Sequence, residues 1–313
     1  MGGCADANKG ETPNGDSRPA LMRAASAASI CVAVFLIVLK TAALAATDSV
    51  AMLSGLIDSS LDAAASFLNY WAIRESLTPA DSSHRFGHGK VEPLASLGQA
   101  AFIAGSAAIL TFQSFHYILR PRVVENAGLG MAVTGVAMLV TLGLVLFQRY
   151  VVKKTNSVAI FADYSHYAGD IMLNAGIMAS LFVGKYFEFK YADPVFALIV
   201  AVYLLVCASR ILKRSFVQLI DTELPAEEKK KIVATVKSFP DVMGVHDIRT
   251  RSSGMQLFIQ LHLELDPNLT LVRAHAIADG VEKSLQEAFP NAEVFIHQDP
   301  AGIYEPHPDW SYE

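Results

Sequence analysis

Long apolar stretches separated by short polar ones occupy the first two thirds of the chain. A helix needs roughly 20 mostly apolar residues to cross a bilayer. Pro79 and Pro121 are expected to end the second and third stretches, and Asp193 with Pro194 is expected to start the sixth as N-cap and first-turn residue. The pattern predicts six transmembrane helices within residues 21–217. Their approximate bounds are 22–46, 49–76, 93–118, 127–150, 157–183 and 194–216.

From about residue 221 the pattern becomes that of an aqueous domain. Shorter helical and alternating segments follow one another in the order αββαβ. This order predicts a small ferredoxin-like domain at 218–300, with polar tails at 1–20, expected to be disordered, and at 301–313. The predicted segments are helices at 225–238 and 270–288, and strands at 245–251, 256–265 and 292–297.

Charge gives the orientation of the predicted spans. Basic residues gather on the side that carries both termini, and this excess marks the cytoplasmic side of a membrane protein.

The chain of 313 residues is 52% hydrophobic and 18% charged, with a net charge of -5. No basic stripe with aromatic residues is present, so nucleic acid is an unsuitable partner. The three cysteines are far apart and form no CxxC motif, which excludes a disulfide framework or a thiolate zinc site.

Two predicted spans carry ionisable side chains near their centres. Asp58 and Asp62 lie four residues apart in the second, and His166 and Asp170 lie four residues apart in the fifth. This spacing places each pair on one helical face. A charged side chain at the bilayer centre costs about 2.5–3.5 kcal/mol, so three carboxylates would cost about 10 kcal/mol if unpaired. The alternative to a functional site is that these groups hold helices together by hydrogen bonds or reach water at a helix end.

Three carboxylates and one imidazole suit a tetrahedral Zn²⁺ ion. With the ion bound and the imidazole neutral, the site would carry a net charge near -1; without it the charge would be -3. Crowded, buried carboxylates favour protonation, and metal binding displaces protons. Such a site is therefore expected to exchange metal for protons. Asp163, one turn before His166, is interpreted as lining a water-filled vestibule and not as a ligand.

Two further groups contain potential metal ligands. The loop after the second span contains Asp81, His84 and His88; a chance grouping of surface histidines is the alternative. In the C-terminal domain the potential ligands are four histidines and one of its aspartates. The alternative is that they are scattered residues with structural roles. These are His246, His262, His275, His297 and Asp299.

The chain resembles the cation diffusion facilitator family, and within it the bacterial zinc and iron efflux transporters. The resemblance extends from about residue 22 to 300 and rests on six motifs. They are LIDSSLD at 56–62, PADSSHRFGHGK at 79–90, SHYAGDIMLN at 165–174, HDIRTR at 246–251, FIQLHLE at 258–264 and IHQDP at 296–300.

The resemblance implies a homodimer of six-helix subunits with a metallochaperone-like cytoplasmic domain. It implies that Asp58, Asp62, His166 and Asp170 form the transport site and that the loop ligands form a second site. The ligands of the C-terminal domain would form a binuclear site that bridges the dimer. Lys90 and Asp221 would form an interlocking salt bridge near the membrane surface. Ser165 departs from the family, which has a larger apolar residue there.

The leading hypothesis is a multi-pass protein of the bacterial inner membrane that exports a divalent metal by proton antiport with alternating access. Zn²⁺ is the first candidate; Cd²⁺, Fe²⁺, Co²⁺ and Mn²⁺ suit similar ligands, because selectivity depends on geometry. The alternative is a metal-binding scaffold or sensor without transport. The chain has no HExxH, GxSxG or phosphate-loop motif, so no enzyme activity is expected.

Overall fold

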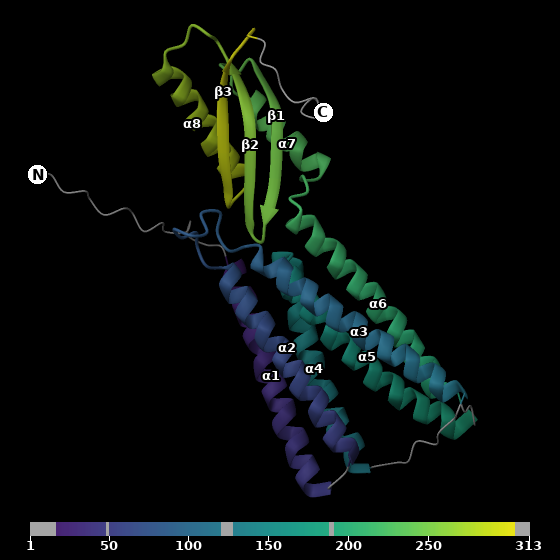
Figure 1. Cartoon of the computed structure of the whole chain (residues 1–313). Coiled ribbons are helices and arrows are strands. Elements are labelled where there is room, and N and C mark those ends of the chain that lie inside the picture. The colour runs from purple at the N-terminus through teal and green to yellow at the C-terminus, as the bar shows by residue number, and fades with distance from the viewer. Residues whose placement is uncertain (1–16, 48–49, 120–127, 188–190, 304–313) are drawn as a thin grey trace, which may run out of the picture.

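Six long helices form one bundle, and a small α/β domain lies at one end of it (Figure 1). The computed structural model describes residues 17–47, 50–119, 128–187 and 191–303. Each of the long helices has 27 to 30 residues, enough to cross a bilayer. Their bounds are Arg18–Thr47 (α1), Val50–Ser76 (α2), Val91–Leu119 (α3), Gly128–Thr155 (α4), Val158–Phe187 (α5) and Ala192–Leu219 (α6). The six predicted helices are confirmed, although parts of the predicted tails lie outside the described residues.

Within the part of the chain that the structure describes, four of these helices, α1, α3, α4 and α6, are long and apolar enough to cross a membrane, judged by length and composition. The other two, α2 and α5, carry Asp58, Asp62, Asp163 and Asp170, which reduce their apolar character. The helices pack in pairs, with α1 along α2 and α3 along α6, while α5 contacts α6 and α4. The two helices with intramembrane aspartates therefore pack among neighbours that have a stronger apolar signal.

The start of α6 differs from the prediction. Tyr191, and not Asp193, is the N-cap residue, and it makes no side-chain capping hydrogen bond. Asp193 lies inside the first turn, where its carboxylate accepts a hydrogen bond from Ser180 Oγ of α5 at 3.2 Å. A negative charge in the first turn still favours the helix. The expected cap is thus wrong because a neighbouring helix engages the carboxylate.

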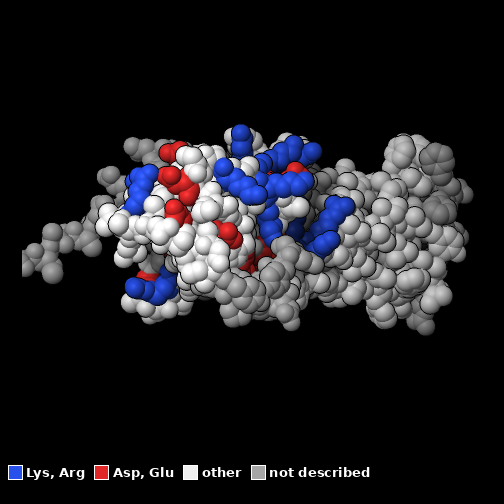
Figure 2. All heavy atoms as spheres, turned by 90° about the horizontal axis from the view of Figure 1, so that it is seen from above, with Lys and Arg blue, Asp and Glu red and all other residues white. Residues whose placement is uncertain are grey.

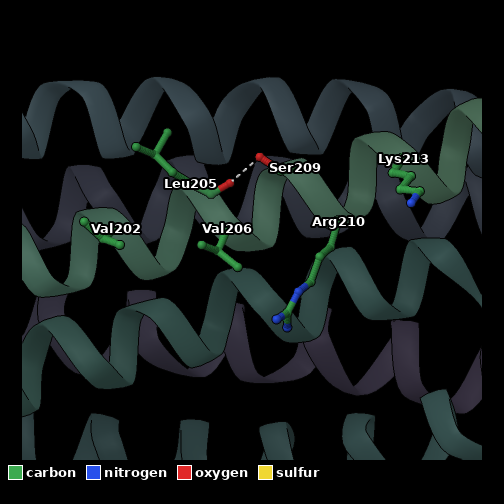
Figure 3. A pocket seen from close by; sticks show the side chains of 6 residues that line it. All are labelled: Val202, Leu205, Val206, Ser209, Arg210 and Lys213. Atoms are coloured by element: carbon green, nitrogen blue, oxygen red, sulfur yellow. Dashed lines mark hydrogen bonds between the residues drawn. The ribbon is translucent and has the colours of Figure 1, made fainter.

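Part of the outer face of α6 forms an open groove of about 400 Å³ (Figure 3). Val202, Leu205 and Val206 make its apolar part, and Arg210 and Lys213 lie toward the end of the helix that leads to the α/β domain. Apolar side chains facing outward beside basic residues near the helix end are typical of a membrane span.

The C-terminal domain has the predicted order αββαβ. Its elements are Ala226–Lys237 (α7), Gly244–Ser253 (β1), Gln256–Leu265 (β2), Leu271–Ala288 (α8) and Ala292–Pro300 (β3). The sheet order is β1-β2-β3; β1 and β2 are antiparallel, and β3 joins β2 in parallel after the α8 crossover. The buried core lies between the sheet and the two helices and includes Ile232, Ile259, Leu263, Val281 and Leu285. Alternation along β2 buries one face of the strand and leaves the other for chemistry.

The α2–α3 loop lies between the bundle and the sheet (Figure 1). The Phe86 ring packs edge-on against Phe258 of β2, and the Arg251 guanidinium lies 4.7–4.8 Å from both ring centroids. A Cβ atom at Gly89 would overlap the Ser253 carbonyl oxygen, so this close approach requires glycine. Lys90 Nζ lies 2.9 Å from the Asp221 carboxylate just after α6. The loop therefore connects the membrane bundle to the β1–β2 hairpin.

Candidate metal centres

Three of the predicted ligands in the bundle converge between α2 and α5. His166 Nε2 lies 3.0 Å from Asp62 Oδ1 and 3.8 Å from Asp170 Oδ2. Ligand atoms of these residues all lie within 4.8 Å of one another. Asp58, one turn from Asp62 on α2, is exposed and lies outside this group. We call Asp62, His166 and Asp170 the bundle cluster; it contains three of the four residues that the sequence predicts.

The bundle cluster has a cationic neighbour that the sequence analysis missed. Lys40 Nζ donates hydrogen bonds to Ser59 Oγ at 2.7 Å and to the Gly55 carbonyl at 3.0 Å. These two acceptors lie on either side of Asp58 on α2. The signal was present, since a lysine inside an otherwise apolar stretch is expensive and points to function.

Asp163 lies in a buried hydrogen-bonded network, so its interpretation as a vestibule residue is wrong. It is 0% exposed. One carboxylate oxygen accepts hydrogen bonds from Ser29 Oγ at 2.5 Å and Gln148 Nε2 at 2.7 Å, and the other accepts from Gln99 Nε2 at 3.5 Å. Donors from α1, α3 and α4 thus surround a carboxylate of α5. The prediction failed because helical spacing indicates a shared face with His166 but not what packs against that face.

Ser165 is buried, and its hydroxyl donates to the Phe161 carbonyl at 2.7 Å. It therefore satisfies its polar group within its own helix. Aromatic rings lie beside His166 instead: the Phe102 ring is 5.8 Å away, edge-on, and the Tyr167 ring is 5.5 Å away. These rings provide apolar surface next to His166.

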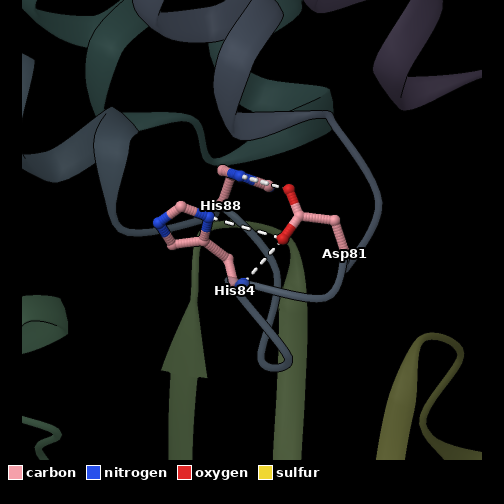
Figure 4. Close-up of side chains that lie close together, drawn as sticks. All are labelled: Asp81, His84 and His88. Carbon is pink, nitrogen blue, oxygen red and sulfur yellow. Dashed lines mark hydrogen bonds and ion pairs between the residues drawn. The ribbon is translucent and has the colours of Figure 1, made fainter.

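The loop residues Asp81, His84 and His88 also come together (Figure 4), and we call them the loop cluster. His84 Nδ1 lies 3.5 Å from Asp81 Oδ1, and His88 Nε2 lies 3.6 Å from Asp81 Oδ2. The backbone N–H groups of His84 and Ser83 donate to Asp81 at 2.6 and 2.8 Å. These two hydrogen bonds lower the pKa of Asp81, because they stabilise the ionised carboxylate. The carboxylate is thus held charged and pointed at two imidazoles.

Strand register assembles the third group, the sheet cluster of His246, His262 and Asp299. His246 pairs with His262 across β1 and β2, and His262 pairs with His297 across β2 and β3. Asp299 Oδ2 lies 2.8 Å from His262 Nδ1 and 3.3 Å from His246 Nε2. The other oxygen of Asp299 lies 3.1 Å from His297 Nε2, so this carboxylate faces ligands on two sides.

His275 does not join the sheet cluster in this chain. It lies on α8 with 68% of its side chain exposed, and its Nδ1 is 3.7 Å from Asp279. Glu264 was missed by the sequence analysis: its Oε1 lies 3.0 Å from His246 Nδ1. A carboxylate that accepts from the second nitrogen of a metal-binding imidazole orients that ring.

Comparison with known proteins agrees with this arrangement of bundle and domain. The model of the cation efflux transmembrane domain matches residues 26–220, and that of the cation efflux protein cytoplasmic domain matches residues 224–301. The cation-efflux pump FieF of Serratia proteamaculans is 44% identical over 283 residues, covering 90% of this chain and 94% of that protein. FieF of Yersinia enterocolitica is 44% identical over 292 residues, covering 93% of this chain and 97% of that protein.

Among solved structures, the metal-bound C-terminal domain of the CzcD transporter from Thermotoga maritima is 28% identical, with a TM-score of 0.25. The match covers 26% of this chain and 100% of the CzcD domain. The two matching domain models together span the described bundle and sheet, and the pump relatives extend over nearly the whole length. The chain is therefore a membrane protein of the cation efflux family, also called the cation diffusion facilitators.

Proposed function

We propose that the protein exports a divalent transition metal, Zn²⁺ foremost, from the cytoplasm in exchange for protons. Cargo binds at Asp62, His166 and Asp170, with Asp58 as the fourth ligand. The observation that carries this proposal is the convergence of the bundle cluster from two different helices inside the bundle. The named FieF relatives are cation-efflux pumps, which supports export as the direction.

The donor spacing suits a bound ion. Ligands at about 2.0–2.2 Å from a tetrahedral Zn²⁺ ion lie about 3.3–3.6 Å from one another. The separations of 3.0 and 3.8 Å from His166 Nε2 lie on either side of this range. Asp58 is on the same helical face as Asp62, so we propose that a rotation of its side chain together with a movement of α2 brings it to the ion. Nitrogen with carboxylate oxygen is a donor set that Zn²⁺ accepts.

Proton coupling follows from the charge of this donor set. Departure of a 2+ ion leaves three carboxylates in a poorly solvated place, where repulsion and burial favour proton uptake. Returning metal needs deprotonated ligands and expels those protons. Alternating access is then a movement of α2 and α5 relative to their neighbours, which opens the cluster first to one side and then to the other.

We place the protein in the bacterial inner membrane, with both termini and the α/β domain in the cytoplasm. Seen from above, a group of Lys and Arg side chains lies on this end of the molecule beside several Asp and Glu side chains (Figure 2). Basic residues on the cytoplasmic side are what the positive-inside rule expects. The sheet and loop clusters hold resident ions outside the transport path. We further propose a homodimer in which His275 from a second copy completes a binuclear site with His297 and Asp299. Lys90 and Asp221 interlock the two domains.

Zinc flux into proteoliposomes with a zinc-sensitive dye and an imposed pH gradient tests this function. The native chain is expected to accumulate zinc in proportion to the gradient, and Asp62→Ala to fall to the leak level of empty vesicles. Flux that persists in Asp62→Ala would refute the assigned transport site. Zinc binding through the sheet cluster without flux in the native chain would favour a scaffold or sensor.

A further inference from the structure

A carboxylate from α2 approaches the loop cluster. Glu75, in the last turn of that helix, has Oε1 at 3.8 Å from His88 Nε2. The same nitrogen lies 3.6 Å from Asp81 Oδ2. His88 thus faces two carboxylates that belong to two different segments, a helix end and the following loop.

These separations fit a shared cation better than direct hydrogen bonds. A hydrogen bond from an imidazole nitrogen to a carboxylate oxygen is about 2.7–3.2 Å long. Ligands around a tetrahedral divalent ion are about 3.3–3.6 Å apart, because each bond is about 2.0–2.2 Å. The distances from His88 Nε2, 3.6 and 3.8 Å, are close to the second range.

Burial gives the ring a fixed direction. The His88 side chain is 8% exposed, whereas Asp81 and Glu75 are 50% and 37% exposed. His88 Nδ1 is buried and has no hydrogen-bond partner among the described residues. The ion-pair contacts of this imidazole are therefore all at Nε2, which points toward both carboxylates.

We infer that Glu75 is the fourth ligand of the loop site, together with Asp81, His84 and His88. This inference rests on the proposed loop site and extends its ligand set. Two carboxylates and two neutral imidazoles balance the charge of a divalent ion, whereas the loop residues alone leave one positive charge uncompensated. Four protein ligands make a closed site of the structural type, with no open position for exchange. Glu75 stands outside the group that lies within 4.8 Å, so a small movement of its exposed side chain completes the set.

The position of Glu75 gives such an ion a mechanical role. Glu75 lies 13 residues after Asp62 on α2, about 20 Å along the helix at 1.5 Å per residue. Phe86, two residues before His88, packs on Phe258 of the sheet. An ion held by Glu75 and the loop therefore ties the cytoplasmic end of a transport helix to the α/β domain.

Metal titration of the full-length protein in detergent tests the inference without reference to transport. The background carries Asp62→Ala and Asp299→Ala, because Asp299 faces the ligands on both sides of the proposed binuclear site, so that neither the bundle nor the α/β domain binds. Zn²⁺ affinity, by competition with a chelating dye, and the visible absorption of bound Co²⁺ are compared with and without Glu75→Gln. Asp81→Ala serves as the loss-of-site reference. Glu227→Gln, at an exposed glutamate of α7, is the matched control.

We expect Glu75→Gln to weaken binding at least about 10- to 100-fold, the loss that removal of even an outer partner of a metal ligand causes. The Co²⁺ bands should also shift, because an oxygen ligand changes, while Glu227→Gln leaves both readouts unchanged. If Asp81→Ala abolishes binding but Glu75→Gln has the same Zn²⁺ affinity and Co²⁺ absorption as the background protein, Glu75 is not a ligand and this inference is overturned. If Asp81→Ala also has no effect, the loop site of the proposed function falls as well. Unchanged gel-filtration profiles establish that the variants are folded.

Discussion

The bundle cluster and the sheet cluster use similar ligands but are built in different ways. The bundle cluster joins side chains of two helices, and Asp58 remains outside it. In the sheet cluster, hydrogen-bonded register places His246, His262 and His297 side by side across three strands. Helices in a bundle can slide or tilt with little loss of backbone hydrogen bonding, whereas a change of register would break a whole ladder. We therefore expect the helical site to change its geometry more easily than the site built on the sheet.

The strongest test of this contrast compares two variants, each of which damages one of the two clusters. His166→Ala removes the residue that contacts both other members of the bundle cluster, and we expect proteoliposome zinc flux to fall more than about 100-fold, to the leak level. His246→Ala should retain most of the flux at saturating zinc but lose binding to the α/β domain. The measurement is initial flux beside zinc stoichiometry for both variants. Equal loss of flux in both would show that the two clusters do not have separate roles.

The Asp163 network sharpens the contrast, because it is a buried polar contact that joins four helices of the bundle. Asp163→Leu removes the acceptor that Ser29, Gln99 and Gln148 share. Ser29 Oγ still has the Ala25 carbonyl as acceptor and Gln148 Nε2 still has Ser29 Oγ, so we expect a loss of about 1–3 kcal/mol for the network as a whole. We expect a lower thermal unfolding temperature of the full chain in detergent. Asp163→Asn is the same size and retains one acceptor oxygen, so its unfolding temperature should fall less. A native unfolding temperature in Asp163→Leu would contradict a structural role for the network.

The junction between the two regions should contribute less to stability. The ion pair of Lys90 and Asp221 is half exposed, and exposed pairs contribute about 0–1 kcal/mol. Lys90→Ala is therefore expected to change thermal stability only slightly. Its larger effect should be on coupling, seen as faster protease cleavage between the bundle and the α/β domain. Lys229→Ala, which removes another exposed pair, is the control and should cleave at the native rate.

The smallest expected effect concerns pH and Asp81. The backbone N–H groups that lower its pKa stabilise the folded state only while the carboxylate is ionised. This contribution is present above the unfolded pKa of about 3.9 and is lost as pH falls through the lower folded value. The stabilisation of the metal-free native chain relative to Asp81→Asn should thus persist from pH 7 to pH 5 and be lost only below about pH 4. A difference that shrinks within this interval would contradict the assigned hydrogen bonds.

Helix and strand positions were predictable because apolar periodicity follows local geometry. All six membrane helices and the αββαβ order agree with the sequence analysis to within a few residues. The i, i+4 pairs were also predictable, since both members lie on one helix. The roles of Glu264 and Lys40 could not be predicted, because the partner of Glu264 lies on another strand and that of Lys40 on another helix. Asp163 was misinterpreted for the same reason.

The membrane bundle, the aqueous domain and the residues with metal-binding side chains can all be predicted from the sequence. Each of these depends on local composition and spacing, which one segment specifies alone. The packing of the elements is needed to see that Asp62, His166 and Asp170 meet while Asp58 stays outside, and that His275 lies apart from the sheet cluster. It is also needed to see that Glu75 approaches His88. These contacts depend on how separate elements pack, and packing is set by the shapes of many side chains together.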